Sequence, residues 1–204
     1  MLVATKGGHT RRGTDWELDG SPEHLARACR DSLKRLGVER IGLYQHHRPD
    51  PQVPYAETIG GLKQLHDEGL IEMAGLSNAD PDQIREAHGI LGDALCAVQN
   101  EFSPRFRTSE PEIDLCEELG LAFLAWSPLG GMREASELGE RWDAFRDVAA
   151  KHEASPQQVA IAWELARSEC VIPIPGASRP ESVRDSAAAV HLVLDDEDLA
   201  RLIG

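Results

Sequence analysis

The 204-residue chain lacks paired cysteines and any long hydrophobic run. Its four cysteines stand singly, without the spacing of a zinc site or a CxxC motif, at Cys29, Cys96, Cys116 and Cys170. We therefore expect reduced, buried thiols in a cytoplasmic protein. No run of about 18 apolar residues occurs, so we expect no membrane-spanning helix. The first six residues also lack the apolar stretch and cleavage site of a signal peptide.

Basic residues are scarce as well, with 21 Lys and Arg against 35 Asp and Glu and a net charge of -14. A nucleic acid is therefore not expected as a main partner, because phosphate binding needs a basic face. The acids are spread along helical segments, which is typical of a solvated surface. The chain has neither a GxGxxG motif nor a P-loop, which argues against a Rossmann or Walker nucleotide site.

The chain instead alternates short β-rich runs with longer helical stretches, the pattern of a parallel α/β fold. We predict strands at residues 2–5, 40–46, 71–76, 94–102, 121–126 and 171–174. Helices are expected at 21–36, 55–68, 80–91, 113–119, 140–152, 155–167, 179–189 and 195–202. Serine or aspartate followed by proline marks several starts, as at Ser21, Asp80 and Ser155. We interpret residues 1–204 as a single domain.

These six strand–helix units predict most of a (β/α)₈ barrel, which needs eight units. We therefore expect two N-terminal units to be absent and the barrel to be incomplete. Such a barrel would have two open strand edges, through which the chain could associate with itself.

Function in such a barrel lies at the carboxyl ends of the strands. The strand ends present Lys6, His47, Ser77-Asn78, Gln99 with Glu101, residues 126–129 and residues 175–179. Some of these residues could also have no role in function. Lys6 could be an ordinary surface lysine, and Trp126 could be an ordinary core residue. His46 and His47 should point to opposite faces of a strand, so we predict no metal site there. Residues 175–179 combine a glycine, a hydroxyl and a cation before a helix, which fits a phosphate cradle.

Taken in order, these segments resemble the aldo/keto reductase family over nearly the whole chain. The resemblance is carried by Val3-Ala4-Thr5-Lys6-Gly7-Gly8, Leu43-Tyr44-Gln45-His46-His47-Arg48-Pro49, Gly75-Leu76-Ser77-Asn78, Val98-Gln99-Asn100-Glu101-Phe102-Ser103, Ala125-Trp126-Ser127-Pro128-Leu129-Gly130 and Ile174-Pro175-Gly176-Ala177-Ser178-Arg179-Pro180. It implies a (β/α)₈ barrel that binds NADPH without a Rossmann domain and reduces carbonyl compounds to alcohols.

The resemblance also implies roles for individual residues. Lys6 matches the lysine that lowers the pKa of the family's catalytic tyrosine, and His47 matches the histidine that orients the substrate carbonyl. Trp126 matches the aromatic ring that stacks on the nicotinamide. The implied cofactor-binding set is Ser77, Asn78, Gln99, Trp126, Ser127, Pro128, Leu129, Gly176, Ser178, Arg179, Ser182, Asp185 and Ser186.

The chain departs from the family pattern at several positions. The family's catalytic aspartate and tyrosine precede the lysine, and this chain starts after that point. Tyr44 and Tyr55 do not occupy that sequence context. Gly42 stands where an aspartate is common, and His46 where a leucine is common. Asp185-Ser186 stands where an acid followed by asparagine is usual near the adenine.

Three interpretations follow. The chain is part of an ordinary NADPH-dependent reductase, or a short NADP(H)-binding or accessory module without catalysis, or an enzyme completed by another chain. The loop at residues 127–139 is short and contains glycine, which predicts an open pocket with broad aldehyde or ketone acceptance.

Overall fold

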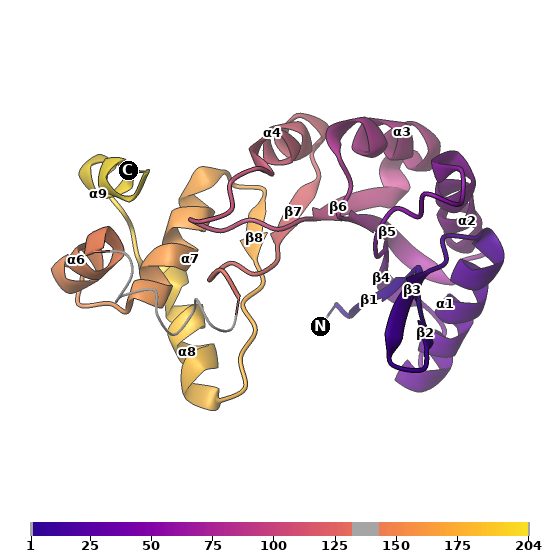
Figure 1. The fold of residues 1–204 in the computed structure, drawn as a ribbon, viewed down its shortest axis with the longest axis horizontal. Helices are drawn as coiled ribbons and strands as arrows, with labels where there is room; N and C mark the ends of the chain where they lie inside the picture. Colours follow the sequence, from indigo (N-terminus) through magenta and orange to yellow (C-terminus); the bar gives the residue numbers. More distant parts are fainter. Residues whose placement is uncertain (1, 132–142, 204) are drawn as a thin grey trace. The chain divides into compact units, whose positions relative to one another are not determined.

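The computed structural model describes residues 2–131 and 143–203, which fall into two compact units. Unit 1 comprises residues 1–99 with 118–121, and unit 2 comprises residues 100–117 with 122–204. Both units alternate parallel strands with helices, as the sequence pattern predicts (Figure 1). The expectation of a single domain over residues 1–204 stays a prediction.

Unit 1 is a parallel sheet covered by helices. Its strands lie in the order β1 (Ala4–Gly7), β4 (Ile41–His46), β5 (Ile71–Ser77) and β6 (Leu95–Gln99). Helices α1 (Pro22–Leu36), α2 (Tyr55–Asp67) and α3 (Pro81–Leu91) lie side by side along the strands (Figure 1). A short 3₁₀ helix, η1 (Gly92–Ala94), leads into β6.

An antiparallel hairpin follows β1 and was not predicted from the sequence. It consists of β2 (His9–Arg12) and β3 (Asp15–Leu18). Gly13, at φ 65°, lies in the turn between the two strands. The hairpin strands are short and largely polar, so they lack the apolar run on which the strand predictions relied.

The predicted helix starts are confirmed by their capping contacts. The Ser21 hydroxyl accepts a hydrogen bond from the backbone N–H of His24, with Pro22 in the first turn. Asp80 and Gln83 cap α3 reciprocally, each side chain accepting from the other's backbone N–H. Gly37 ends α1 in the left-handed conformation at φ 67°. Local sequence therefore sets the ends of these helices.

Unit 2 contains two parallel strands and most of the remaining helices. Its strands are β7 (Ala122–Ala125) and β8 (Val171–Pro173). The helices are α4 (Glu110–Leu119), α6 (Asp143–Lys151), α7 (Pro156–Arg167), α8 (Pro180–Ala188), η2 (Ala189–His191) and α9 (Asp196–Ile203). Phe102 is fully buried, edge-on to Phe123 and stacked on Trp163 at 5.4 Å between ring centroids.

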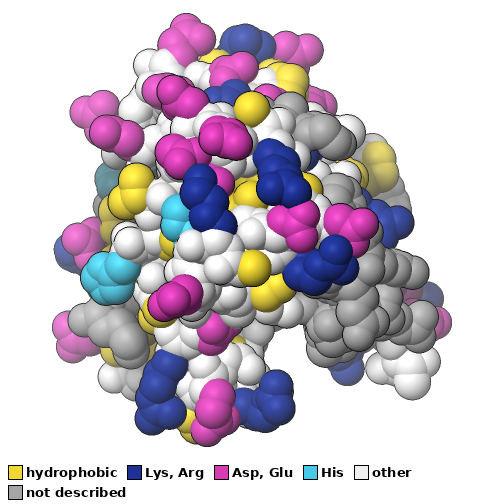
Figure 2. Space-filling model, turned by 90° about the vertical axis from the view of Figure 1, so that its left-hand side faces the viewer, with side chains coloured by type: hydrophobic (Ala, Val, Ile, Leu, Met, Phe, Trp, Pro, Cys, Tyr) yellow, Lys and Arg dark blue, Asp and Glu magenta, His cyan; other side chains and the backbone are white. Residues whose placement is uncertain are grey.

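Acidic and basic side chains alternate over the face of unit 2 that carries α6 and α9 (Figure 2). Lys151 on α6 donates to both Asp195 and Asp198 at 2.8 Å, which ties α6 to α9. This arrangement agrees with the solvated acidic surface that the composition indicates. Within the described residues, no helix has the length and apolar character needed to cross a membrane.

The predicted strands are all present, with shifted ends. The first strand lies at Ala4–Gly7 instead of 2–5. The strand expected over 94–102 ends at Gln99, because its beginning forms η1 and its last residues leave the ladder. Residues 132–139 of the expected open-pocket loop, and residues 140–142 of the expected helix at 140–152, lie outside the described residues.

Candidate functional site

Strand register places several predicted residues on one face of the unit 1 sheet. Lys6 pairs with Gln45, and Ser77 pairs with Gln99. Partners in a parallel ladder point to the same face, and alternate residues of a strand share a face. Gln45 also pairs with Gly75, two residues before Ser77. Lys6, Gln45, Ser77 and Gln99 therefore share one face, at the carboxyl ends of their strands.

His47 joins this face one residue beyond the end of β4. Its backbone N–H donates to the carbonyl of Gly7 at 2.8 Å, which continues the ladder between β1 and β4. Alternation places its side chain on the face of Gln45, two residues earlier. The Lys6 ammonium is close enough to act on the His47 imidazole electrostatically. Lys6 and His47 thus face the same side of the sheet.

The electrostatics of this cluster keep His47 uncharged. Burial lowers the pKa of His47 to about 4, with the positive charges of His9, Lys6 and Arg48 acting in the same direction. Burial also lowers the pKa of Lys6 from its ordinary value. At neutral pH, His47 is therefore a neutral imidazole that can donate one N–H, beside a partly buried ammonium group.

Asn78 fastens three strand ends together. Its Nδ2 donates to the His47 carbonyl and to the Ser77 hydroxyl, both at 3.1 Å, and its backbone N–H donates to the Gln99 carbonyl at 3.0 Å. Asn78 adopts a left-handed φ of 57°, which asparagine tolerates better than most residues. The observed contacts of Asn78 thus position His47, Ser77 and Gln99.

Gln45 is a polar member of this face that the sequence analysis did not select. Its side chain is fully buried, and both its amide oxygen and nitrogen lack a hydrogen-bond partner among the described residues. Buried amides without partners are costly, so such groups often serve a ligand or water. The signal in the sequence was its place two residues before His47, where alternation puts both side chains on one face.

The two tyrosines and His46 lie on other surfaces. The Tyr44 hydroxyl donates to the carbonyl of Leu25 on α1 at 3.3 Å. The His46 ring lies 6.2 Å from that of Tyr55 on α2, so it faces the helix layer while His47 faces the other way. Burial raises the pKa of both Tyr44 and Tyr55. Neither hydroxyl resembles a tyrosine whose acidity is increased by a nearby lysine.

In unit 2, Trp126 lies directly after β7. Its backbone N–H donates to Asn100 at 3.1 Å, and its carbonyl accepts from Phe102 at 3.3 Å. The ring is partly exposed, but the indole N–H is buried without a hydrogen-bond partner among the described residues. The next residue, Ser127, has a φ of 53° and begins a turn closed by a hydrogen bond from Gly130. Pro128 in this turn is buried.

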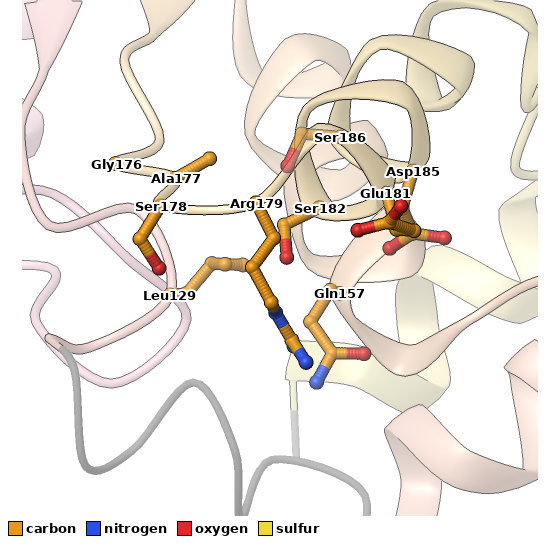
Figure 3. A pocket seen from close by; sticks show the side chains of 10 residues that line it. All are labelled: Leu129, Gln157, Gly176, Ala177, Ser178, Arg179, Glu181, Ser182, Asp185 and Ser186. Carbon is orange, nitrogen blue, oxygen red and sulfur yellow. The ribbon is translucent and has the colours of Figure 1, made fainter.

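A pocket of about 710 Å³ in unit 2 brings together many of the residues predicted to bind cofactor (Figure 3). Its lining comes from the turn after β7, the start of α7, the loop after β8 and the first two turns of α8. Predicted residues in the lining are Leu129, Gly176, Ser178, Arg179, Ser182, Asp185 and Ser186. The sequence analysis missed Gln157, Ala177 and Glu181, which also line it.

Arg179 is the cation of this pocket. Its side chain extends from the start of α8 toward Gln157 (Figure 3). None of the described side chains forms an ion pair with it, although 35 acids are present in the chain. No side chain caps the start of α8, and Pro180 has no N–H, so the backbone N–H groups of Glu181 and Ser182 can bind an anion.

Asp185 is held by the start of α7. One carboxylate oxygen accepts from the Ser155 hydroxyl and the other from the Gln158 side chain, both at 2.7 Å. Ser155 is also the N-cap of α7. The Asp185 carboxylate therefore connects α8 to α7 and shapes the wall of the pocket.

No cluster of three or more His, Cys, Asp or Glu side chains in residues 2–131 and 143–203 is arranged to hold a metal ion. All four cysteines, which lie in this part of the chain, are free thiols.

Comparison with known proteins identifies relatives over the whole chain. The model of the aldo/keto reductase family matches residues 1–203. The chain is 38% identical over 229 residues to the probable aldo-keto reductase 1 of Glycine max, covering 99% of this chain and 66% of that protein. It is 36% identical to the uncharacterized oxidoreductase C215.11c of Schizosaccharomyces pombe, covering 99% of this chain and 64% of that protein. The chain thus spans about two thirds of the length of these curated relatives.

Solved structures of aldo/keto reductases also resemble this chain. A thermostable aldo-keto reductase, Tm1743, bound to the inhibitor epalrestat superposes with a TM-score of 0.80 at 28% identity, covering 90% of this chain and 66% of that one. An aldo/keto reductase from Klebsiella pneumoniae bound to NADP and acetate gives 0.80 at 26% identity, covering 99% and 68%. The fold is that of a (β/α)₈ barrel, of which this chain contains an incomplete set of units. On the match of residues 1–203 and on these relatives, the chain belongs to the aldo/keto reductase family.

Proposed function

We propose that this chain carries the substrate-orienting and cofactor-binding residues of an NADPH-dependent reductase that converts aldehydes or ketones to alcohols. The observation that supports this most directly is the shared face of Lys6 and His47 at adjacent strand ends. A neutral imidazole N–H and an ammonium group are both donors to a carbonyl oxygen. Donors fixed before the reaction stabilise the negative charge that develops on that oxygen.

The residues of the unit 2 pocket fit the phosphorylated part of NADPH. Arg179 has no acidic partner among the described residues, and the uncapped start of α8 offers backbone N–H groups beside it. The hydroxyls of Ser178 and Ser182 line the same pocket. A guanidinium group, backbone N–H groups and hydroxyls are the usual partners of a phosphate. For the nicotinamide we propose Ser77, Asn78 and Gln99, and Trp126 for its ring, as the family resemblance implies.

NADPH, when bound, supplies the hydride that reduces the carbonyl carbon. Lys6 and His47 orient the carbonyl oxygen, and the low pKa of His47 keeps its imidazole neutral and able to donate a hydrogen bond. Asn78 holds the His47 backbone in place. The carbonyl oxygen takes up one proton as the hydride reaches the carbon, and the Lys6 ammonium, whose pKa burial lowers, can donate it. A positioned general acid typically contributes about 10²–10⁴-fold to such a reaction.

A second candidate is a non-catalytic NADP(H)-binding or accessory module. The positions of the two tyrosines favour it, because the Tyr44 hydroxyl donates to α1 and Tyr55 lies at the start of α2 with its ring near that of His46. Burial raises the pKa of both, which opposes proton donation. The reductase and the non-catalytic module would use the same NADPH pocket, and only the reductase would convert a carbonyl substrate.

We also infer a small carbonyl compound as the partner, with neither nucleic acid nor membrane, and the cytoplasm as the compartment. The net charge of -14 and four free cysteines support these inferences.

The cofactor assignment is tested by NADPH fluorescence titration of wild type, Arg179→Ala and Arg184→Ala. Hydrogen bonds to charged groups contribute about 1.5–3 kcal/mol, so Arg179→Ala should weaken NADPH binding roughly 10- to 100-fold. Arg184 is a matched control, because it is an exposed arginine on α8 that does not line the pocket. It should leave the affinity within about twofold. Equal affinity in all three proteins would overturn the cofactor assignment.

A further inference from the structure

The β2–β3 hairpin brings a stack of side chains against His47. The rings of His9 and His47 lie 4.1 Å apart between centroids, at an angle of 35°. The Trp16 ring lies 5.7 Å from that of His9, and the Arg11 guanidinium lies 4.0 Å from the centre of the Trp16 ring. Arg11, Trp16, His9 and His47 thus form a continuous stack from the hairpin to the strand end.

The register of the hairpin explains why these residues meet. Arg11 pairs with Trp16, and His9 pairs with Leu18. Cross-strand partners share a face, so one face of the hairpin carries His9, Arg11, Trp16 and Leu18. Gly8 turns the chain from β1 into β2 at φ 104°, and a Cβ atom there would lie 2.9 Å from the His46 ring. The hairpin therefore approaches the β4 end closely because residue 8 is glycine.

Trp16 is unusually accessible for a tryptophan, with 62% of its surface exposed. The Trp16 side chain buries little area, so its contribution to the packing of unit 1 does not explain a tryptophan at this position. Large exposed aromatic groups beside polar site residues are typical of binding surfaces. Arg11 covers one face of the Trp16 ring, and the exposed remainder of the ring is open to a planar ligand.

The charges around the stack are positive in a chain whose net charge is -14. The groups that act on His47 are His9, Lys6 and Arg48, all of them basic. Arg48 also acts on His9, and Arg11 lies on Trp16. The nearby acids face elsewhere. Asp50 acts on His46 on the other side of β4 and accepts hydrogen bonds from the backbone of Gly20 and Gln52. Asp15 and Glu17 lie on the opposite face of the hairpin, and Asp19 accepts hydrogen bonds from Ser21. A local cationic region of this kind attracts an anionic substituent.

We propose that this hairpin face is the substrate wall of the reductase site. Trp16 selects aromatic carbonyl compounds that carry a carboxylate, and His9 is a positioning residue that holds the His47 ring. This inference rests on the proposed reductase function. The planar part of the substrate packs on Trp16, its carboxylate lies near Arg11, and its carbonyl oxygen accepts from His47.

Substrate selection is tested by NMR titration of the NADPH-bound protein with 4-acetylbenzoate, acetophenone and acetone. We expect 4-acetylbenzoate to bind most tightly and acetone most weakly, with the His47 and Trp16 resonances shifting together. Trp16→Ala should weaken both aromatic ligands about tenfold, because stacking contributes roughly 0.5–1.5 kcal/mol beyond the area buried. Acetone binding should not change, and Trp16→Phe should restore most of the aromatic affinity.

The carboxylate preference has a matched pair of variants in adjacent residues. Arg11→Gln should weaken 4-acetylbenzoate about fivefold, as expected for one partly screened ion pair, and leave acetophenone unchanged. Arg12→Gln is the control. Arg12 lies on the opposite face of the hairpin, and its side chain forms an ion pair with Glu17 at 3.4 Å. Equal loss in both variants, or unchanged aromatic affinity in Trp16→Ala, would overturn the proposal.

The role of His9 in covering and holding the His47 ring is tested through the titration of His47. His9→Ala exposes the His47 ring and should raise its pKa, whereas His9→Phe keeps the ring contact and should hold it closer to the wild-type value. The same His47 pKa in all three proteins would overturn the positioning role. If the wild-type protein does not bind NADPH, that result would instead count against the proposed function. Failure of the proposed function and failure of the substrate wall therefore give different results.

Discussion

Lys6 and His47 lie on the same face of the unit 1 sheet, where burial lowers the pKa of the His47 imidazole and the Lys6 ammonium adds to that effect. The two residues are 41 positions apart in the sequence, and the parallel pairing of β1 with β4 brings them together. Their proximity gives a direct electrostatic coupling that can be measured without any substrate.

Replacing Lys6 by methionine should raise the pKa of His47 above about 4, because one of the positive charges beside it is removed, while burial still holds it below its ordinary value. Lys6→Arg keeps a positive charge and should leave the pKa of His47 near that of the wild type. Histidine NMR titration measures the change, and Lys34→Met on the exposed side of α1 is the control. No difference between Lys6→Met and Lys34→Met would contradict the shared face.

The two tyrosines should differ in their effect on stability. Tyr44→Phe removes a buried hydrogen bond to Leu25 and should lower the free energy of unfolding by about 1 kcal/mol. The Tyr55 hydroxyl has no hydrogen-bond partner among the described residues, so Tyr55→Phe should be neutral or stabilising by up to about 1 kcal/mol. Urea unfolding measures both. A loss of NADPH-dependent turnover without a loss of stability in either variant would show that a tyrosine of this chain takes part in catalysis.

Glu164 on α7 should make the protein less stable as the pH rises. Its carboxyl is fully buried with no hydrogen-bond partner in residues 2–131 and 143–203, and burial raises its pKa from 4.5 to about 10. The folded protein therefore holds a proton that the unfolded chain releases above pH 4.5. The free energy of unfolding should fall by about 1.4 kcal/mol per pH unit across this window, a cost of about 3 kcal/mol at pH 7.

Glu164→Leu should remove this cost and flatten the pH dependence of stability between pH 5 and about 9. Glu117→Gln, in an exposed position on α4, serves as the control and should change neither the free energy of unfolding at pH 7 nor its pH dependence. Thermal unfolding followed over that pH range is the measurement. A wild-type protein whose stability is constant over it would show that Glu164 is solvated or paired in solution.

The strand edges should support self-association. β1 pairs with β4 on one side, and β8 pairs with β7 on one side; neither has a second partner strand among residues 2–131 and 143–203. Unpaired parallel edges expose backbone N–H and carbonyl groups that can pair with another chain. Sedimentation velocity over a range of concentrations should show dimers or larger species, which Ala4→Pro in β1 reduces, because the backbone N–H of Ala4 points to the open edge and not to β4. A monomer at all concentrations would contradict this expectation.

The order of strands and helices, and the capping residues at Ser21 and Asp80, could be predicted because they depend on local sequence. So could the face shared by Gln45 and His47, which follows from alternation in one strand. Strand ends were less predictable, because hydrogen bonds to neighbouring strands decide where β6 stops.

The hairpin at residues 9–18 could not be predicted in this way. Its residues are polar, and it is defined by cross-strand pairs and by contacts of His9 with His47 that depend on the fold. The lack of an ion-pair partner for Arg179, and the hydrogen bonds that hold Asp185, likewise depend on where α7 and α8 meet. The sequence suggested Arg179 through the cradle pattern of residues 175–179, and Asp185 only through the family resemblance.

The reductase function is tested most directly by hydride transfer. The wild-type protein is incubated with 4-acetylbenzoate and NADPH deuterated at the nicotinamide C4, and the alcohol is analysed by mass spectrometry. The account predicts slow formation of an alcohol with one deuterium on the former carbonyl carbon, lost in His47→Ala. Tight NADPH binding with no deuterated alcohol would contradict the reductase function and leave the NADP(H)-binding module as the function of this chain.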